Sequence, residues 1–447
     1  MANESGRWGT QLKSPDLLRL FALLLATTVL AARLLLIVKR YSVNVLYHDQ
    51  WIFDDATIFQ KHSLLEIFRW QHGPHRLGVG GLLSKLIEPT FHWNSRYEAF
   101  GVWGIICLAC FAAVWLKIRL FGRLGYADAV IPLLFFTPVQ YESLIGGVSP
   151  AHGPLPLLVV MLYCVAWTIE AERRRYVWVL VVNMLLIYTG FGLFMGILTP
   201  FVTGIDYYRR RNRAAFVACM VSTLTMASFF VGYRTDTAAG CSVGLDNPIH
   251  YFLFVGFMLA NFIQIHVSRT LVLAIMIGSL VAVALLATSG FFLIRTLRNK
   301  SLSGAQLITS ILLLYSVLFS FSTAYGRMCL GLAAAQGSRY MTYLVLFFFA
   351  LYLGALSAQV RIERNVFVGM VAALALLSSG FVEKMNVASM EEIAHERQAW
   401  SACYLRTSDI DSCDRETDSF ICWRPEPPDL KLKLEYLKQH HLNLYSQ

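Results

Sequence analysis

The segment that decides the fold class is LLRLFALLLATTVLAARLLLIV, residues Leu17–Val38. Apart from two arginines it contains only apolar or small side chains, and it is as long as the roughly 20 residues that a helix needs to cross a bilayer. It exceeds the apolar core of about 7–15 residues in a secretory signal peptide, and no small-residue cleavage site follows it. We therefore expect an uncleaved transmembrane helix here.

The rest of the chain has the same apolar character. Of its 447 residues, 56% are hydrophobic and 15% are charged, and the mean hydropathy is +0.54. A soluble domain carries about 25% charged residues, so we predict an all-α polytopic membrane protein. The net charge of +10 does not indicate nucleic-acid binding, because the basic residues form short clusters between apolar segments, as the positive-inside rule describes.

Apolar windows predict about eleven transmembrane helices. The windows are 17–38, 100–117, 127–145, 151–168, 176–189, 191–206, 214–232, 271–294, 304–322, 340–358 and 366–382. The basic clusters between them alternate regularly, which predicts an inner (plasma) membrane protein with a cytoplasmic N-terminus and an extracytoplasmic C-terminus.

Three places do not fit this simple threading. Lys39 and Arg40 lie outside, against the positive-inside rule, and could instead bind lipid phosphate there. The windows 176–189 and 191–206 are short, so we expect two short helices that meet below the membrane surface at the break Tyr188–Gly192. Residues 251–268 would disturb the charge alternation if they crossed the membrane, and they are expected to form an interfacial or a re-entrant helix.

The threading divides the chain into a transmembrane domain, residues 1–382, and an extracytoplasmic tail, residues 383–447. The domain includes a large first extracytoplasmic loop, residues 39–98, in which short amphipathic helices are expected to lie flat on the outer leaflet. An extracytoplasmic location permits disulfide bonds. We expect one or two that involve the tail, and their pairing stays open. The candidate cysteines are Cys403, Cys413 and Cys422 in the tail, with Cys241 and Cys329 in other outer loops.

Titratable residues gather in the first loop, in YHDQWIFDDATIFQKHSLLEIFRWQHGPHR, residues Tyr47–Arg76. Asp49 follows the first span at the outer boundary, where a carboxylate could act as a general base or simply cap the next helix. Asp54 and Asp55 come five and six positions later, so neither shares a helix face with Asp49. They could be solvated surface carboxylates, or they could help to hold a divalent cation.

The same stretch ends in HGPHR, which contains His72, His75 and Arg76. Two histidines alone are a weak metal signal, and the glycine and proline between them argue against a regular helix, so we predict no metal site. A polar cluster of this kind at the start of a helix would suit a phosphate group. The alternative is a turn before an ordinary amphipathic helix.

Tyr141 and Glu142 lie at the outer end of the third predicted span. A glutamate at that depth is costly unless it is paired or functional, so it could contact a substrate or pair with an arginine. His152, in the next outer turn, is a weaker member of the same group.

Arg327, Arg339 and Tyr340 lie on the same side of the membrane according to the threading. Two arginines at the outer boundary can clamp a phosphate or pyrophosphate. The alternative is that both arginines only snorkel to the membrane interface.

This layout resembles that of the membrane-embedded glycosyltransferases of the C superfamily. The resemblance rests on YHDQW and HGPHRL in the first loop and on Arg327 followed by SRY, residues 338–340. It covers most of the chain in layout and a few short motifs in sequence. It implies transfer of a sugar, with inversion, from a polyprenyl-phosphate donor to a glycan or lipid-linked acceptor during bacterial surface-glycan synthesis. Asp49 would then activate the acceptor, and Arg76, Arg327 and Arg339 would contact the donor phosphate.

One departure concerns a metal ion. Many members of the superfamily have two acids separated by one residue in the first loop, whereas Gln50-Trp51 follows Asp49 here. The resemblance therefore leaves a divalent cation open, and it implies no other cofactor. The implied partners are the lipid-linked donor, the acceptor and membrane lipids.

Two other functions remain as alternatives. A transporter or flippase for lipid-linked glycans would be expected to show internal repeat symmetry, which this sequence lacks. A polysaccharide polymerase or ligase would be expected to have a large loop late in the chain, whereas the largest internal outer loop comes first here. The chain contains no P-loop and no H-E-x-x-H motif.

Overall fold

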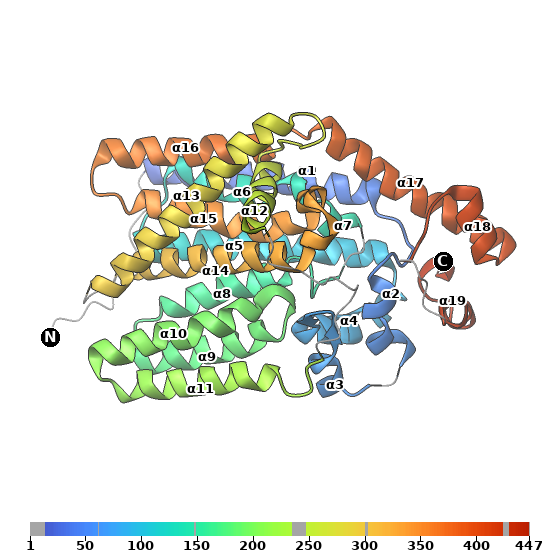
Figure 1. The fold of residues 1–447 in the computed structure, drawn as a ribbon, viewed down its shortest axis with the longest axis horizontal. Helices are drawn as coiled ribbons and strands as arrows, with labels where there is room; N and C mark the ends of the chain where they lie inside the picture. Colours follow the sequence, from blue (N-terminus) through green and yellow to red (C-terminus); the bar gives the residue numbers. More distant parts are fainter. Residues whose placement is uncertain are drawn as a thin grey trace.

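The computed structural model describes residues 14–60, 62–146, 149–234, 247–299, 303–422 and 429–446. These residues form an elongated helical bundle with a cap of shorter elements at one end (Figure 1). The long axis of the bundle is followed by α1 (Ser14–Tyr41), α5 (Ser95–Phe121), α8 (Leu155–Trp167), α9 (Glu172–Ile187), α10 (Leu193–Arg210), α11 (Arg213–Phe229), α13 (Leu271–Arg298), α14 (Gly304–Arg327), α15 (Met341–Leu356) and α16 (Arg361–Ser379).

The outward faces of this bundle are suited to lipid. Seven helical segments among the described residues are long and apolar enough to cross a membrane. Large apolar side chains point outward from them, and Phe21, Val272 and Leu280 are 61%, 70% and 65% exposed. Water would make such a surface unfavourable, whereas acyl chains would not. The expectation of an all-α, membrane-embedded protein is therefore confirmed, while the count of eleven spans is not.

The predicted span 127–145 is wrong as a continuous helix. The chain forms only α6 (Val130–Phe135) and α7 (Glu142–Ile145) there, with short 3-10 turns at Tyr126–Ala129 and Pro138–Gln140. Helix α6 ends before Pro138, because a proline cannot donate a backbone hydrogen bond and clashes with the preceding helical turn. The break is also held from outside, since the Thr137 hydroxyl donates to the Ser378 carbonyl at 2.7 Å.

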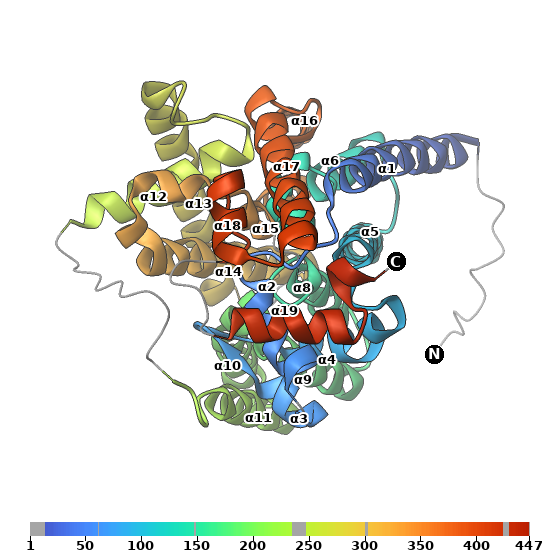
Figure 2. The same ribbon diagram turned by 90° about the vertical axis from the view of Figure 1, so that its right-hand side faces the viewer.

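The two irregular regions behave differently from ordinary spans. Helices α9 and α10 are separate and are joined by a short turn at Gly190–Gly192, as the sequence predicts. Helix α12 (Pro248–Phe262) runs across the direction of α13 and α14 (Figures 1 and 2). Its side chains from Phe254 to Phe262 are all buried. The second half of α12 is therefore enclosed by other parts of the protein.

The cap joins the first loop to the tail at one end of the bundle. It contains α2 (Gln50–Phe53), α3 (Leu64–Arg69), β1 (Gln71–His72), β2 (His75–Arg76), α4 (Gly78–Ile87), α17 (Lys384–Thr407), α18 (Ile410–Thr417) and α19 (Leu430–Gln439). Figure 2 looks onto this end and shows α19 crossing in front of α2 and α4. The turns from α10 to α11 and from α15 to α16, which carry basic residues, lie at the opposite end (Figure 1).

Buried polar contacts hold the tail against the first loop. Arg397 of α17 is 1% exposed, and its guanidinium donates to the carbonyl of Val43 at 2.7 Å and to that of Val45. Lys433 of α19 forms an ion pair with Asp55 at 2.6 Å. The tail is therefore part of the structure around the first loop and not a separate appendage.

A disulfide bond between Cys403 and Cys413 links α17 to α18, so the expected bridge in the tail is confirmed. Cys329 is also disulfide-bonded. Cys241 lies outside the described residues.

A close backbone approach seats the first loop on the α9–α10 break. Gly78, at the start of α4, has a φ of +54°, and a Cβ atom there would collide with the carbonyl oxygen of Tyr188. Gly190 has a φ of +50°, and a Cβ atom there would collide with the carbonyl oxygen of Ala151. Glycine alone permits both the left-handed backbone and the short separation.

Candidate functional site

Asp49 lies in the turn between α1 and α2. Its neighbour His48 has a φ of +49°, a left-handed conformation that is unfavourable for residues other than glycine. The tail stabilises this turn, because the His48 backbone N–H donates to the Ile421 carbonyl at 2.6 Å. Asp49 occupies the N-cap position of α2, but its side chain makes no capping hydrogen bond. The alternative that Asp49 serves as a helix cap is therefore wrong.

Arg339 is a cation close to Asp49. It lies in the short 3-10 turn Ser338–Tyr340 before α15, and its guanidinium interacts electrostatically with the carboxylates of Asp49 and Glu142. The Glu142 carboxylate accepts a hydrogen bond from the Arg339 backbone N–H at 3.0 Å. The Arg339 side chain is accessible to solvent although protein surrounds it densely. Two opposite charges from distant parts of the chain thus interact at a solvent-accessible place.

The two predicted tyrosines, Tyr141 and Tyr340, lie close to this group. The guanidinium of Arg339 lies 5.7 Å from the ring centroid of Tyr340, and Tyr340 is 3% exposed. Tyr141 is 8% exposed, and its hydroxyl interacts with Ser389 of α17. Both tyrosines are therefore buried close to Glu142 and Arg339.

Three histidines form a second group. His72 and His75 come from the β-hairpin, and His152 comes from the turn before α8. The ring centroid of His152 lies 5.8 Å from that of His72 and 5.3 Å from that of His75. Phe53 stacks on His152, with centroids 4.5 Å apart and an interplanar angle of 5°. Neither ring nitrogen of His152 has a hydrogen-bond partner among the described residues.

Arg327, at the end of α14, interacts electrostatically with all three imidazoles. Burial, followed by the His72 ring and Arg327, lowers the pKa of His75 to about 3. Burial is also the main cause that lowers the pKa of His152 well below its ordinary value. The imidazoles of His75 and His152 are therefore neutral near pH 7. At His72, Asp49 opposes the lowering of the pKa, so His72 interacts electrostatically with both Asp49 and Arg327.

The hairpin separates the predicted HGPHR motif into two faces. Gln71 pairs with Arg76 and His72 pairs with His75. Opposite residues of an antiparallel pair share a face and successive residues alternate, so the two histidines face one way and Gln71 and Arg76 the other. Gly73, with a φ of +52°, permits the tight turn between the strands.

Arg76 is consequently not part of the group around Arg327 and Arg339. Its side chain is 3% exposed and donates to the carbonyls of Phe229 at 2.7 Å and Val231 at 3.0 Å, and to that of Arg69. The expectation that Arg76 joins these two arginines on one phosphate is therefore wrong. The hydrogen bonds of Arg76 attach the hairpin to the end of α11.

Asp54 and Asp55 have different partners. Asp54 is 8% exposed and interacts electrostatically with Glu88, while Thr57 donates to its carboxylate at 3.2 Å. Burial and Glu88 raise the pKa of Asp54 well above its ordinary value. The surface-carboxylate alternative is therefore wrong for Asp54, and Asp55 instead forms the ion pair with Lys433.

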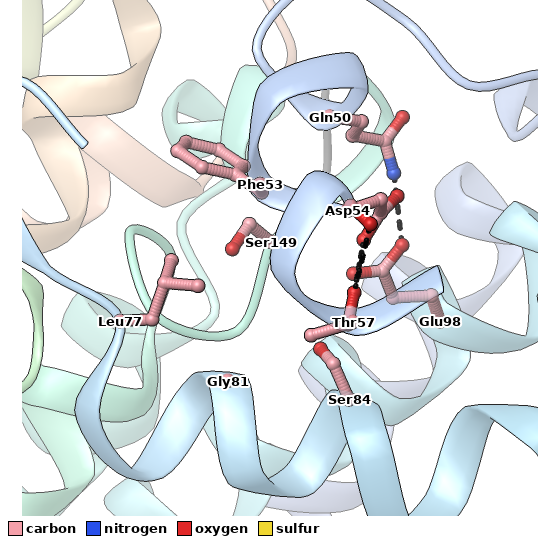
Figure 3. A pocket seen from close by; sticks show the side chains of 9 residues that line it. All are labelled: Gln50, Phe53, Asp54, Thr57, Leu77, Gly81, Ser84, Glu98 and Ser149. Carbon is pink, nitrogen blue, oxygen red and sulfur yellow. Dashed lines mark hydrogen bonds between the residues drawn. The ribbon is translucent and has the colours of Figure 1, made fainter. Parts of the chain in front are cut away.

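The surroundings of Asp54 form a small polar cavity (Figure 3). Its volume is about 10 Å³, which is about the space of a single water molecule. Glu98 lines it beside Asp54, and Gln50 Nε2 donates to the Glu98 carboxylate at 2.8 Å. Within the described ranges, no group of three or more His, Cys, Asp or Glu residues is arranged to hold a metal ion. Nothing in the geometry thus supports Asp54 and Asp55 as cation ligands.

The sequence alone does not predict some of the contacts in this site. His152 was connected with Glu142 and not with His72 and His75, because no sequence spacing links the turn before α8 to the hairpin. The contact from Ile421 to His48 was not expected, since both are ordinary residues in their own segments. The turn signal in SPAHGP, residues 149–154, could have marked His152 as a loop histidine, but not its neighbours.

The predicted residues therefore fall into distinct places in the cap. Asp49, Glu142 and Arg339 form one group, and His72 connects it to Arg327 and the other histidines. No protein-family description matches this chain, and neither a curated protein nor a solved structure is significantly similar to it. We therefore infer function from the residues and their geometry.

Proposed function

We propose that the protein transfers a sugar from a polyprenyl-phosphate donor to a hydroxyl group of a glycan or lipid-linked acceptor, on the extracytoplasmic face of the membrane. The observation that carries this proposal is the electrostatic interaction between Asp49, in the first loop, and Arg339, in the turn before α15. The reaction needs a base for the acceptor proton and a positive charge for the departing phosphate. A carboxylate and a guanidinium that interact electrostatically can meet both needs.

The bond changes balance without any further reactant. The acceptor oxygen attacks the anomeric carbon and forms the new glycosidic bond, while its proton passes to the Asp49 carboxylate. The bond from the anomeric carbon to the phosphate oxygen breaks, and its electron pair leaves with the polyprenyl phosphate. A single displacement of this kind inverts the anomeric configuration. Because phosphate is a stable leaving group, positioning and electrostatic stabilisation could supply most of the rate enhancement.

Arg339 is suited to the phosphate because of what surrounds it. A guanidinium can donate two parallel hydrogen bonds to phosphate oxygens. Glu142 accepts the backbone N–H of Arg339, and the ring of Tyr340 lies beside the guanidinium, so the residue is held at its backbone and along its side chain. The side chain nevertheless stays accessible to solvent, as an incoming head group requires.

The histidine group is suited to sugar hydroxyls. A neutral imidazole offers one donor and one acceptor, which matches the mixed hydrogen bonding of a sugar. His152 has both ring nitrogens without a partner among the described residues, and the ring of Phe53 against it provides an apolar surface of the kind that borders ligand sites. Arg327 adds a second positive charge beside these rings.

The test compares Asp49→Asn with a matched control, Asp411→Asn, which alters an exposed carboxylate in α18 of the same cap. Membranes containing each variant are supplied with a polyprenyl-phosphate sugar, and new glycosidic bonds are measured. We expect Asp49→Asn to lose roughly 10²-fold or more in rate, the contribution typical of a positioned base, and the control to match the wild type. Full activity of Asp49→Asn would refute the assignment. Movement of a lipid-linked glycan across sealed vesicles without a new glycosidic bond would favour the flippase alternative.

A further inference from the structure

The second face of the hairpin borders a basic groove that the proposed reaction does not use. The groove has a volume of about 460 Å³, which lies within the roughly 300–1,000 Å³ of typical ligand pockets. Its lining includes three arginines, Arg69, Arg76 and Arg234, together with Trp70 and Glu66. It lies between α3, the hairpin and the segment that follows α11.

The walls of this groove are fixed to each other. Arg76 bonds to the carbonyls of Phe229 and Val231 after the last turn of α11. Gln71 binds the Arg234 backbone twice, since its Nε2 donates to the Arg234 carbonyl at 2.7 Å and its Oε1 accepts the Arg234 N–H at 2.9 Å. The groove therefore exists before any ligand binds, which lowers the entropic cost of binding.

The positive charge in the groove is poorly compensated. No ion pair joins Arg69, Arg76 or Arg234 to a carboxylate in the part of the chain that the structure describes. Glu66 is engaged elsewhere, because its carboxylate accepts hydrogen bonds from the backbone N–H and the hydroxyl of Ser63 at 2.7 and 2.8 Å. Burial, with a contribution from Arg69, lowers the pKa of Arg76. A bound anion would relieve this accumulation of like charges.

The rim of the groove is apolar. Leu65 on α3 is 66% exposed, and Phe230 and Val231 at the end of α11 are 53% and 59% exposed. The outer face of α11 continues this surface, with Leu224 69% exposed. Basic residues next to outward-facing apolar side chains are typical of the boundary between the acyl chains and the head groups of a bilayer.

We propose that this groove binds the phosphate head group of an anionic glycerophospholipid. Arg69 and Arg234 donate to the phosphate oxygens above Arg76, and the acyl chains lie along the exposed apolar face of α11. The bound lipid fixes the hairpin from the side opposite to His72 and His75. This site does not depend on the proposed sugar transfer.

The test uses the full chain in bilayer discs of phosphatidylcholine containing a minor fraction of phosphatidylglycerol. The variant is the double substitution Arg69→Gln/Arg234→Gln, which leaves Arg76 and its hydrogen bonds intact. The matched control is Arg415→Gln/Lys431→Gln, which removes two exposed charges from α18 and α19 of the same cap. Phosphatidylglycerol that remains bound after extraction into detergent is counted by mass spectrometry.

We expect the wild type and the control to retain phosphatidylglycerol and the double variant to lose about tenfold or more of it, since each charge-assisted hydrogen bond contributes about as much as a tenfold change in affinity. Equal retention by the variant, with an unchanged unfolding temperature, overturns the proposal. Two competition experiments identify the source of the phosphate. Displacement of the lipid by inorganic phosphate alone would show a free-anion site, and displacement by polyprenyl phosphate alone would show a carrier site, and either result overturns the glycerophospholipid assignment.

Discussion

Replacement of Lys433 by methionine should detach the C-terminal helix from the first loop. Lys433 has a side chain that is 5% exposed, and its ammonium lies 2.6 Å from a carboxylate oxygen of Asp55. It also donates to the carbonyl of Trp51 at 3.2 Å. Methionine preserves much of the length and the apolar stem but removes the charge and both hydrogen bonds.

The expected loss of stability can be estimated from these contacts. Breaking a buried ion pair by removing one partner costs about 3–5 kcal/mol. The Asp55 side chain is 20% exposed, so water partly solvates the carboxylate that remains, and we expect about 2–4 kcal/mol for Lys433→Met. Asp55→Asn in the same background should recover part of this loss, with a coupling energy of about 1–3 kcal/mol.

The assay is thermal unfolding of the purified full chain, combined with limited proteolysis of the tail. Lys431→Met is the matched control, since Lys431 lies on the same helix and is exposed. We expect Lys433→Met to unfold at a lower temperature and its tail to be cleaved faster, and the control to resemble the wild type. Equal behaviour of the two variants, or a coupling energy near zero, would show that the tail does not brace the first loop.

Three further predictions concern other parts of the cap. Gly78→Ala should destabilise the protein by about 2–5 kcal/mol, because it combines a left-handed backbone with a collision against the Tyr188 carbonyl, and an unchanged unfolding temperature would contradict the close packing. Burial raises the pKa of Glu88 from 4.5 to about 7, so the stability that Glu88 contributes is complete below about pH 4.5 and is lost as the pH rises to about 7. Glu88→Gln should flatten this pH dependence of the free energy of unfolding between about pH 4 and 8. An identical pH profile for the variant and the wild type would refute this prediction. Arg327→Gln and Arg339→Gln should each raise the KM for the lipid-linked donor by about tenfold or more, whereas an unchanged donor KM in both variants would exclude the phosphate contact.

The fold class could be predicted from the sequence because lipid exposure is a local property. Hydropathy windows and basic clusters depend on neighbouring residues, and they correctly indicated helices α9 and α10 and the separation between them. The span at 127–145 could not be excluded in this way. A window average does not detect the effect of one proline, Pro138, on the helix before it. It also does not detect the long-range hydrogen bond from the Thr137 hydroxyl to the Ser378 carbonyl.

The site was predictable in part for a related reason. The threading placed Asp49 and Arg339 on the same side of the membrane, and in the structure the two side chains interact electrostatically. The separation of His75 from Arg76 depends on a two-residue strand whose pairing register assigns each side chain to a face. A two-residue strand is too short to show a periodic pattern in the sequence. Only the structure therefore shows that the histidines of HGPHR and its arginine lie on opposite faces of the hairpin.

The burial of Asp54 illustrates a third kind of limit. The sequence around Asp54 resembles an exposed acidic turn. In the structure, however, Asp54 is buried and interacts with Glu88 and Glu98, which come later in the chain than the hairpin. Such long-range packing of like charges is unfavourable unless protons are shared, so local sequence rules predict the opposite arrangement.

The most direct measurement of the central claim is a structure of the Asp49→Asn protein with a polyprenyl-phosphate sugar bound. The substitution should prevent turnover and leave the donor in place. We expect the phosphate within hydrogen-bonding distance of the Arg339 guanidinium and the anomeric carbon on the side of residue 49, with the sugar hydroxyls against His72 and His152. A donor head group bound elsewhere, with its anomeric carbon remote from residue 49, would contradict the assignment of Asp49 as the base.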